Sequence, residues 1–296
     1  MTEFLQQLLN GISLGAIFAL IALGYTMVYG VLRFINFAHS DVFMVGAFVG
    51  YYMGRLVPEH TFWGGFAALG AAMAVCAVLG VVIERLAYRP LRGAATLNVL
   101  ITAIGVSLLL QNLGQFFFGA TPRPFPELFP ATTFVCGGVY VSSNQLVVIG
   151  VTLGLLFALR FIVMRTKIGT AMRAVSLNPQ AASLVGINND IVISFTFALG
   201  SALAAAGGIL YALNYPSIDP LMGVLPGLKA FVSAVLGGIG NIPGAALGGM
   251  LLGIVETFVN GSEWSTYKDA IAFALLILVL LFRPAGLLGR FTKEKV

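Results

Sequence analysis

Long apolar runs separated by short polar segments dominate the pattern of this chain of 296 residues. A membrane-spanning helix needs about 20 predominantly apolar residues, and most of the runs reach or approach that length. The pattern therefore predicts an all-α polytopic membrane protein, one transmembrane domain over residues 1–296 with 8 or 9 helices, some short or broken. The runs lie at about 8–30, 40–57, 62–83, 95–119, 145–164, 190–213, 226–241, 244–260 and 269–282.

Glycine and proline interrupt the join between the last two runs before the C-terminal one, at 226–241 and 244–260. These two runs are short, so they form either a tilted pair of spans or two half-helices. Small residues four positions apart mark close helix contact in lipid, and such spacing recurs in this chain. The glycines with this spacing, which predict tight packing of the bundle, are Gly46, Gly50 and Gly54; Gly240, Gly244 and Gly248; and Gly249 and Gly253.

Composition supports a membrane protein and excludes two other classes. The chain is 59% hydrophobic and only 9% charged, whereas soluble domains carry about 25% charged residues. A soluble enzyme of this size would lack the charge to cover its surface. Intrinsic disorder is excluded as well, because it requires low hydrophobicity.

The basic residues predict the orientation, because lysine and arginine collect on the cytoplasmic side of a membrane. With nine spans, twelve of the 16 basic residues fall on one side. This arrangement favours nine spans, with the N-terminus periplasmic and the C-terminus cytoplasmic. It also accounts for the net charge of +5 without nucleic acid as a partner. The twelve are Arg33, Arg85, Arg89, Arg92, Arg160, Arg165, Lys167, Arg173, Arg283, Arg290, Lys293 and Lys295.

The outer loop at about 120–144 changes from proline-rich sequence to the segment FVCGGVYV. Alternating β-branched and aromatic residues around a two-glycine turn are typical of a hairpin. The loop therefore predicts a small periplasmic β-hairpin at Gly137–Gly138, which would cap the outer face or contact a partner.

The cytoplasmic loop at about 165–190 predicts two short helices outside the membrane. Asn178 is a good N-cap, Pro179 suits the first helical position, and Gly186 suits the residue that ends a helix. These signals place one helix at about 179–185, after another at about 168–175. Either a membrane surface or the groove of a partner protein would bury the apolar side chains. Those side chains are Leu177, Leu184 and Val185.

Four stretches of this chain resemble one family. The stretch RAVSLNPQAASLVGIN, from Arg173 to Asn188, resembles the coupling segment of LivH-type permeases, the membrane subunits of ABC importers for branched-chain amino acids. The loop also partly resembles the EAA motif of other ABC permeases, but Gln180 stands in place of glutamate and the later Ile-x-Leu-Pro is absent. The similarity spans essentially the whole chain in matching order, and its other stretches are 33–41, 229–245 and 282–289.

This resemblance implies a permease subunit of an ATP-driven importer that moves leucine, isoleucine and valine across the bacterial inner membrane. It also implies two cytoplasmic ABC ATPase subunits, a sister permease in a heterodimer and a periplasmic solute-binding protein as partners. The segment that would couple the permease to the ATPase comprises Arg173, Leu177, Asn178, Pro179, Ala181, Ala182, Leu184 and Gly186.

The chain lacks the sequence features of an enzyme. It contains no GxxxxGK[ST] loop to cradle ATP phosphates. We therefore expect a transport subunit that binds no cofactor, while partner subunits hydrolyse the ATP. Its two histidines, His39 and His60, show no metal-ligand spacing with other residues.

Two regions interrupt regular spans, at 33–41 and 226–244. Irregular backbone at membrane depth is tolerated only where it is buried in protein or lines a cavity. A simpler interpretation puts His39 and Asp41 at a wet cytoplasmic boundary and lets Lys229 reach the outer headgroups. The candidates for a translocation pathway are Asn36, Phe37, His39, Ser40, Lys229, Gly237 and Gly238.

Three other functions stay open at the level of sequence. A permease of the same branch would move urea, short amides or other amino acids. A stand-alone channel or secondary transporter would work without ATP or partners. A structural or signalling membrane subunit would bind a partner through the cytoplasmic loop without any solute flux.

Overall fold

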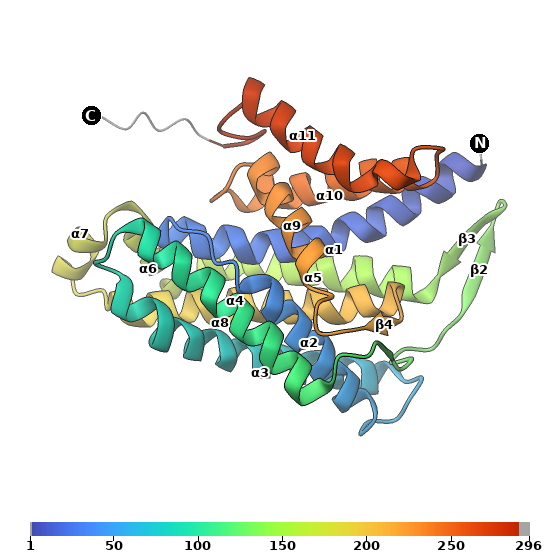
Figure 1. Cartoon of the computed structure of the whole chain (residues 1–296), viewed down its shortest axis with the longest axis horizontal. Coiled ribbons are helices and arrows are strands. Elements are labelled where there is room, and N and C mark those ends of the chain that lie inside the picture. Colours follow the sequence, from blue (N-terminus) through green and yellow to red (C-terminus); the bar gives the residue numbers. More distant parts are fainter. Residues whose placement is uncertain (1, 290–296) are drawn as a thin grey trace.

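Every predicted apolar run becomes a helix in the computed structural model, which describes residues 2–289 (Figure 1). Three short turns interrupt or join the helices: the π-helical η1 (Glu84–Tyr88) and the 3-10 turns η2 (Arg89–Leu91) and η3 (Ser265–Tyr267). The helices are α1 (Thr2–Leu32), α2 (His39–Gly54), α3 (Phe62–Ile83), α4 (Thr96–Phe118), α5 (Ser143–Arg165), α6 (Lys167–Leu177), α7 (Pro179–Leu184), α8 (Asn189–Asn214), α9 (Val224–Gly237), α10 (Ile242–Asn260) and α11 (Lys268–Phe282).

Within residues 2–289, seven helices are long and apolar enough to cross a membrane, judged by length and composition. They are α1, α3 with its following turns, α4, α5, α8, α10 and α11 with η3. A further apolar helix, α9, is shorter, with 14 residues, and α2 has 16 residues and begins with the polar His39, Ser40 and Asp41. The prediction of 8 or 9 helices, some short or broken, therefore fits. Of the two interrupted runs at 226–241 and 244–260, the first forms the short helix α9 and the second forms α10, which is long enough to span.

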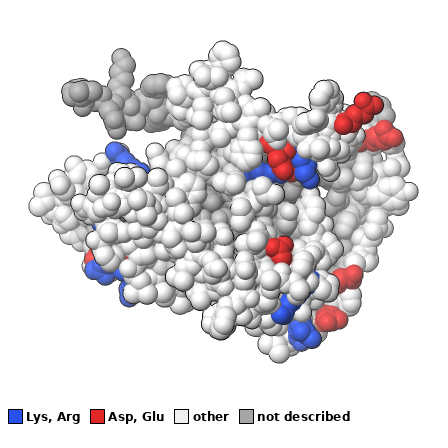
Figure 2. Space-filling view, viewed as in Figure 1, with Lys and Arg blue, Asp and Glu red and all other residues white. Residues whose placement is uncertain are grey.

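Helix α1 forms the core of the bundle. Its residues between Gly11 and Val31 are nearly all buried, and it packs against α8, α9 and α10. By contrast, α4, α5 and α11 expose most of their apolar surface. Apolar side chains can face lipid at little cost, because lipid tails are as apolar as the side chains themselves. On the face in Figure 2 most of the surface is uncharged, and the charged side chains gather mainly toward the two ends.

The two ends of the bundle differ in charge. One end, named here the basic end, carries η1, η2, α6 and α7, and the other, the hairpin end, carries β2 and β3 (Figure 1). The basic residues predicted to share one side of the membrane do lie at the basic end. The members that the structure describes are Arg33, Arg85, Arg89, Arg92, Arg160, Arg165, Lys167, Arg173 and Arg283, whereas Arg290, Lys293 and Lys295 lie outside the described residues.

The predicted hairpin is confirmed. Strands β2 (Thr133–Cys136) and β3 (Val139–Ser142) pair in antiparallel fashion. Gly137 and Gly138 join them with φ of +58° and +83°, the left-handed conformations that a tight two-residue turn requires. A second short pair, β1 (Arg123–Pro124) and β4 (Ser217–Ile218), connects the loop before the hairpin to the segment after α8.

Close helix contact at the spaced glycines is confirmed as well. A Cβ atom on Gly253 of α10 would overlap the backbone of Gly15 of α1, and one on Gly46 of α2 would overlap Ala205 of α8. Two glycines are exceptions, because Gly54 meets the loop residues Pro126 and Leu128 instead of a helix, and nothing lies within 4 Å of the Cβ position of Gly240. Its φ of +90° instead makes the turn between α9 and α10.

A triad of charged side chains joins the last three helices. Lys229 of α9 places its Nζ atom 2.6 Å from Glu256 Oε1 of α10 and 2.6 Å from Asp269 Oδ1 of α11. Lys229 and Glu256 are both buried. The interpretation that Lys229 reaches the outer headgroups is therefore wrong, because two carboxylates hold its ammonium group inside the bundle.

Gly253→Leu is expected to lower the free energy of unfolding by about 1–3 kcal/mol or more, because the side chain would force α10 away from α1. Thermal unfolding of the purified protein in detergent measures the loss. Gly150→Leu is the matched control, since nothing lies within 4 Å of its Cβ position on α5. Equal stability of the two variants would contradict the close contact of α1 and α10.

Lys229→Met is expected to cost about 3–5 kcal/mol of unfolding free energy, because it leaves the carboxylates of Glu256 and Asp269 without a counter-ion. Adding Glu256→Gln should recover part of that loss. Lys268→Met serves as control, because Lys268 forms no ion pair within the described chain. The triad has no stabilising role if both lysine variants unfold at the same temperature.

Candidate functional site

The two short helices predicted in the cytoplasmic loop are present as α6 and α7. Asn178 separates them and accepts a hydrogen bond from the Ala181 amide at 3.0 Å. Pro179 is the first residue of α7, and Gly186 follows this helix with φ of +85°. The capping residues therefore act as the sequence predicts.

The residues predicted to couple to an ATPase divide into two groups. Leu177 and Leu184 are 81% and 88% exposed, and the neighbouring Val185 is 76% exposed. Ala182 is buried, and Arg173 donates to the Val163 carbonyl at the end of α5. The two leucines thus leave apolar side chains open at the ends of α6 and α7, while Arg173 and Ala182 hold these helices in place.

Helix α7 is tied directly to the start of α8. Asn189 donates from its side-chain amide to the Pro179 carbonyl at 2.8 Å. Asn188 caps α8, because its side-chain oxygen accepts from the amides of Asp190 and Ile191 at 3.1 and 3.2 Å. The segment and the first turn of α8 therefore form one bonded unit.

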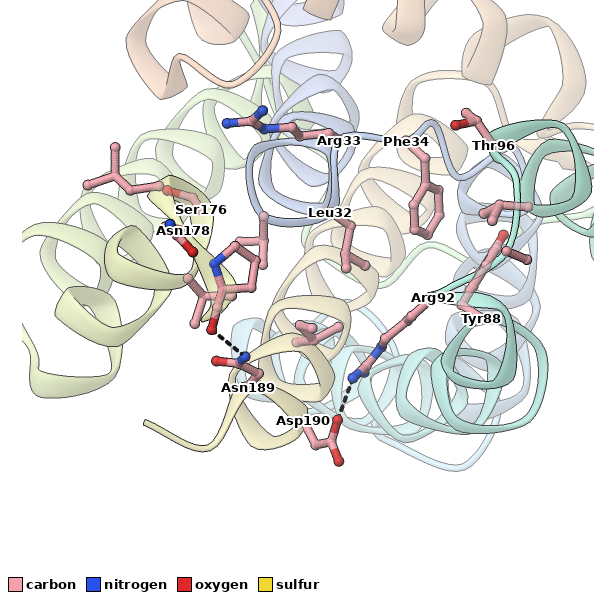
Figure 3. Close-up of a pocket in the computed structure, with 17 residues that line it drawn as sticks. Leu32, Arg33, Phe34, Tyr88, Arg92, Thr96, Ser176, Asn178, Asn189 and Asp190 are labelled. Carbon is pink, nitrogen blue, oxygen red and sulfur yellow. Dashed lines mark hydrogen bonds and ion pairs between the residues drawn. The ribbon is translucent and has the colours of Figure 1, made fainter. Parts of the chain in front are cut away.

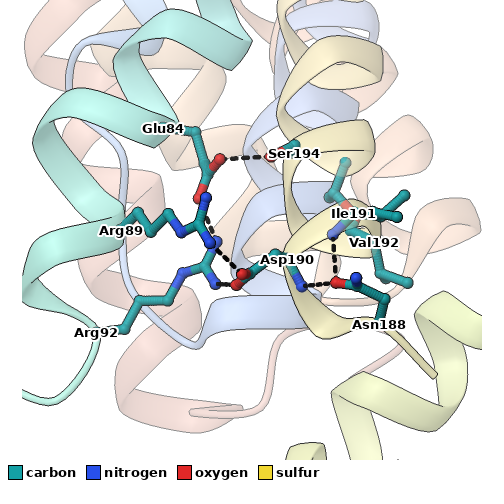
Figure 4. A network of polar contacts seen from close by, with 9 residues as sticks. Glu84, Arg89, Arg92, Asn188, Asp190, Ile191, Val192 and Ser194 are labelled. Carbon is teal, nitrogen blue, oxygen red and sulfur yellow. Dashed lines mark hydrogen bonds and ion pairs between the residues drawn. The ribbon is translucent and has the colours of Figure 1, made fainter. Parts of the chain in front are cut away.

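A set of ion pairs, named here the basic-end network, joins α8 to the turns after α3 (Figure 4). Arg92 donates to both Glu84 and Asp190, and Arg89 also pairs with Asp190. Ser194 donates to the second oxygen of Glu84 at 2.6 Å. Sequence reasoning missed this network, since it took the basic residues only as markers of the membrane boundary. The available signal was an acidic residue directly before the cluster of arginines.

A cavity of about 630 Å³ opens at the basic end beside this network. Figure 3 shows Leu32 and Phe34 near its centre, with Tyr88 and Arg92 on one side and Asn178 on the other. Its wall combines apolar side chains with charged and amide groups. The cavity therefore offers a partly polar opening between α7 and the interior.

The central candidates surround a junction, named here the α2–α9 junction, where the first turns of these two helices meet. Cβ atoms on Gly223 and Gly227 would overlap Ser40, so the two helices touch there. His39 Nε2 lies 3.2 Å from the Ile21 carbonyl of α1, about 16 Å along the helix from its end at Leu32. His39 is therefore buried among helices rather than exposed, because the chain turns back into the bundle after α1.

Aromatic rings pack against one another beside this junction. The Phe231 ring lies 6.1 Å from that of Tyr25 and 6.2 Å from that of Phe37. Asp41, also buried rather than at a wet boundary, accepts from Gln111 at 3.0 Å. No side chain caps α2 or α9, so the positive ends of two helix dipoles meet beside apolar walls.

The structure brings Asn36, Phe37, His39 and Ser40 together at this junction and separates the remaining candidates from it. Lys229 belongs to the triad and lines a cavity of about 120 Å³ nearer the hairpin end. Gly237 and Gly238 pack against Gly244 and Gly289, where backbone approaches backbone.

Metal chemistry receives no support from the described part of the chain. Within residues 2–289, no group of three or more histidine, cysteine, aspartate or glutamate side chains is arranged to hold an ion.

Comparison with known proteins agrees with the architecture. A family model described as a branched-chain amino acid transport system permease component matches residues 7–280. The permease protein BraD of Pseudomonas aeruginosa is 44% identical over 99% of this chain and 98% of its own length. LivH of Escherichia coli (strain K12) is 42% identical over the same shares of the two chains.

A more distant relative covers less of the chain. The ribose import permease protein RbsC of Haemophilus influenzae is 31% identical over 43% of this chain and 42% of its own length. Matches over nearly the full length of BraD and LivH, together with several apolar helices, identify a multi-pass membrane protein. The chain belongs to the family of branched-chain amino acid transport system permease components.

Proposed function

We propose that this chain is the permease subunit of an ATP-driven importer that moves leucine, isoleucine and valine across the bacterial inner membrane. The observation that carries the proposal is similarity along the whole chain. BraD and LivH are both named permease proteins of high-affinity branched-chain amino acid transport systems, and each matches 99% of this chain.

The proposed orientation puts the basic end in the cytoplasm and the hairpin end in the periplasm. Arginine and lysine favour the cytoplasmic side, and the basic end holds most of those that the structure describes. The N-terminus is then periplasmic and the C-terminus cytoplasmic.

Two cytoplasmic ABC ATPase subunits supply the energy in this proposal, and this chain binds no cofactor itself. The exposed apolar side chains of Leu177, Leu184 and Val185 suit insertion into a groove of an ATPase. Asn178, Pro179, Ala181 and Gly186 would shape that contact, while Arg173 and Ala182 anchor it.

The remaining partners are a sister permease in a heterodimer and a periplasmic solute-binding protein. The hairpin supports contact with the latter, because it projects from the hairpin end with exposed Phe134, Val135 and Tyr140 side chains. Such exposed aromatic residues are typical of protein interfaces.

The proposed pathway passes the α2–α9 junction. The positive ends of two helices would attract the carboxylate of an amino acid, and the aromatic wall would accept a branched side chain. Asn36, Phe37, His39 and Ser40 are the residues of this chain that line the proposed path. Lys229, Gly237 and Gly238 remain candidates with evident packing roles.

Reconstitution of the permease with its sister, ATPases and binding protein should give ATP-dependent uptake of labelled leucine, isoleucine and valine into proteoliposomes. The permease alone should give none. Uptake of urea or short amides in place of these amino acids would favour the other permeases of this branch. Flux through the permease alone would favour a channel or secondary transporter.

Leu184→Asp should weaken binding of the ATPase about tenfold or more, because docking would bury an unpaired carboxylate. Co-purification of the ATPase with the permease measures this loss. Thermal unfolding of the permease alone should not change, since Leu184 is exposed. Leu184→Met is the control and should bind normally. Normal binding of both variants would contradict docking through α7.

A further inference from the structure

The basic-end network is fixed on one side to the helix pair that would contact the ATPase. Asp190 is the second residue of α8, and the neighbouring Asn189 donates to the Pro179 carbonyl of α7 at 2.8 Å. Asn188 caps the same turn of α8. A displacement of α7 therefore also displaces the carboxylate of Asp190.

Arg92 connects that carboxylate to the turn after α3. Its guanidinium group donates through one nitrogen to Asp190 and through another to Glu84 (Figure 4). Glu84 has no exposed side-chain surface, and Ser194 of α8 holds its second oxygen. The planar fork of Arg92 offers each acid its own nitrogen and so fixes the direction between the two bonds, whereas a lysine ammonium such as that of Lys229 pairs with two acids as a point charge.

Stability alone is a weak reason for such a network. Replacing a buried ion pair with well-packed apolar side chains is often neutral or stabilising. What the pairs do specify is geometry, because the fork of Arg92 bonds both carboxylates in the observed placement of η1 and α8 and would lose a bond if the two moved apart.

The π-helical turn η1 continues the connection into the interior. Such turns are rare and occur frequently at functional sites. Glu84 begins η1 and Tyr88 ends it, and both are buried. Tyr88 Oη donates to Asn36 Oδ1 at 2.6 Å, and the Asn36 carbonyl accepts from the His39 amide at 3.2 Å. Bonded groups therefore lead from α7 to the first turn of α2.

We infer that Arg92 is a positioning residue of the transport cycle. It transmits a displacement of α7 through Glu84 and Tyr88 to Asn36, and thereby sets the position of α2 at the α2–α9 junction. The inference rests on the proposed function, because it takes the partner ATPase as the source of the displacement.

The complete reconstituted importer tests this with Arg92→Lys, Asp190→Asn and Tyr88→Phe. The first removes the arginine fork, the second removes the carboxylate charge that Arg89 and Arg92 share, and the third removes the hydroxyl that bonds Asn36, and all three nearly keep the volume. The ratio of leucine taken up to ATP hydrolysed should fall about fivefold or more in each variant. Arg92→Lys combined with Asp190→Asn should lose little more, since both break one connection. Arg85→Lys is the matched control on the exposed side of η1 and should keep the ratio.

The ratio separates transmission from a purely structural role. A structural defect would reduce the yield and thermal stability of the complex but leave the uptake per ATP unchanged. An unchanged ratio in either Arg92→Lys or Tyr88→Phe overturns the inference. A wild-type importer without ATP-dependent leucine uptake contradicts the proposed function instead, before any variant is compared.

Discussion

Lipid offers no hydrogen-bond partner to a peptide group, and this constraint shapes the whole bundle. A chain that leaves helical conformation at membrane depth must do so inside the protein. The structure obeys this at residues 33–38 and before α9, where both interruptions lie against other helices. Helix α1 supports them from the centre, and α4, α5 and α11 separate the interior from lipid.

The same constraint explains where the few charges lie. A charge inside a membrane protein is stabilised by a partner of opposite sign, or by hydrogen bonds such as the one that Asp41 accepts from Gln111. Lys229 forms ion pairs with carboxylates on two neighbouring helices, and Glu84 forms an ion pair with Arg92. The triad joins the consecutive helices α9, α10 and α11, and the basic-end network joins the turns after α3 to the distant α8, so the charges that lipid would reject fix helices to one another.

The sequence predicts the local features of this protein well, because their causes are local. The length of the apolar runs predicts the helices, the Asn178–Pro179 pair predicts the start of α7, and Gly137 and Gly138 predict the turn of the hairpin. Which helix is central is not predictable from hydropathy, since buried α1 and exposed α11 are both apolar. The depth of His39 and the partner of Glu84 depend on tertiary contacts, with Glu84 and Ser194 separated by 110 positions.

The α2–α9 junction lies between two groups of helices, and this placement favours it as a moving part. On one side, α2 packs against α3 and α8, with Gly46 against Ala205. On the other, α9 packs against α10 and α11 and is held there by Lys229. Each group has its own charged cluster, at opposite ends of the bundle. Packed groups move as rigid bodies more readily than they deform. Because α1 packs against both α8 and α10, relative motion of the two groups would change the contact of Ser40 with Gly223 and Gly227 together with one face of α1.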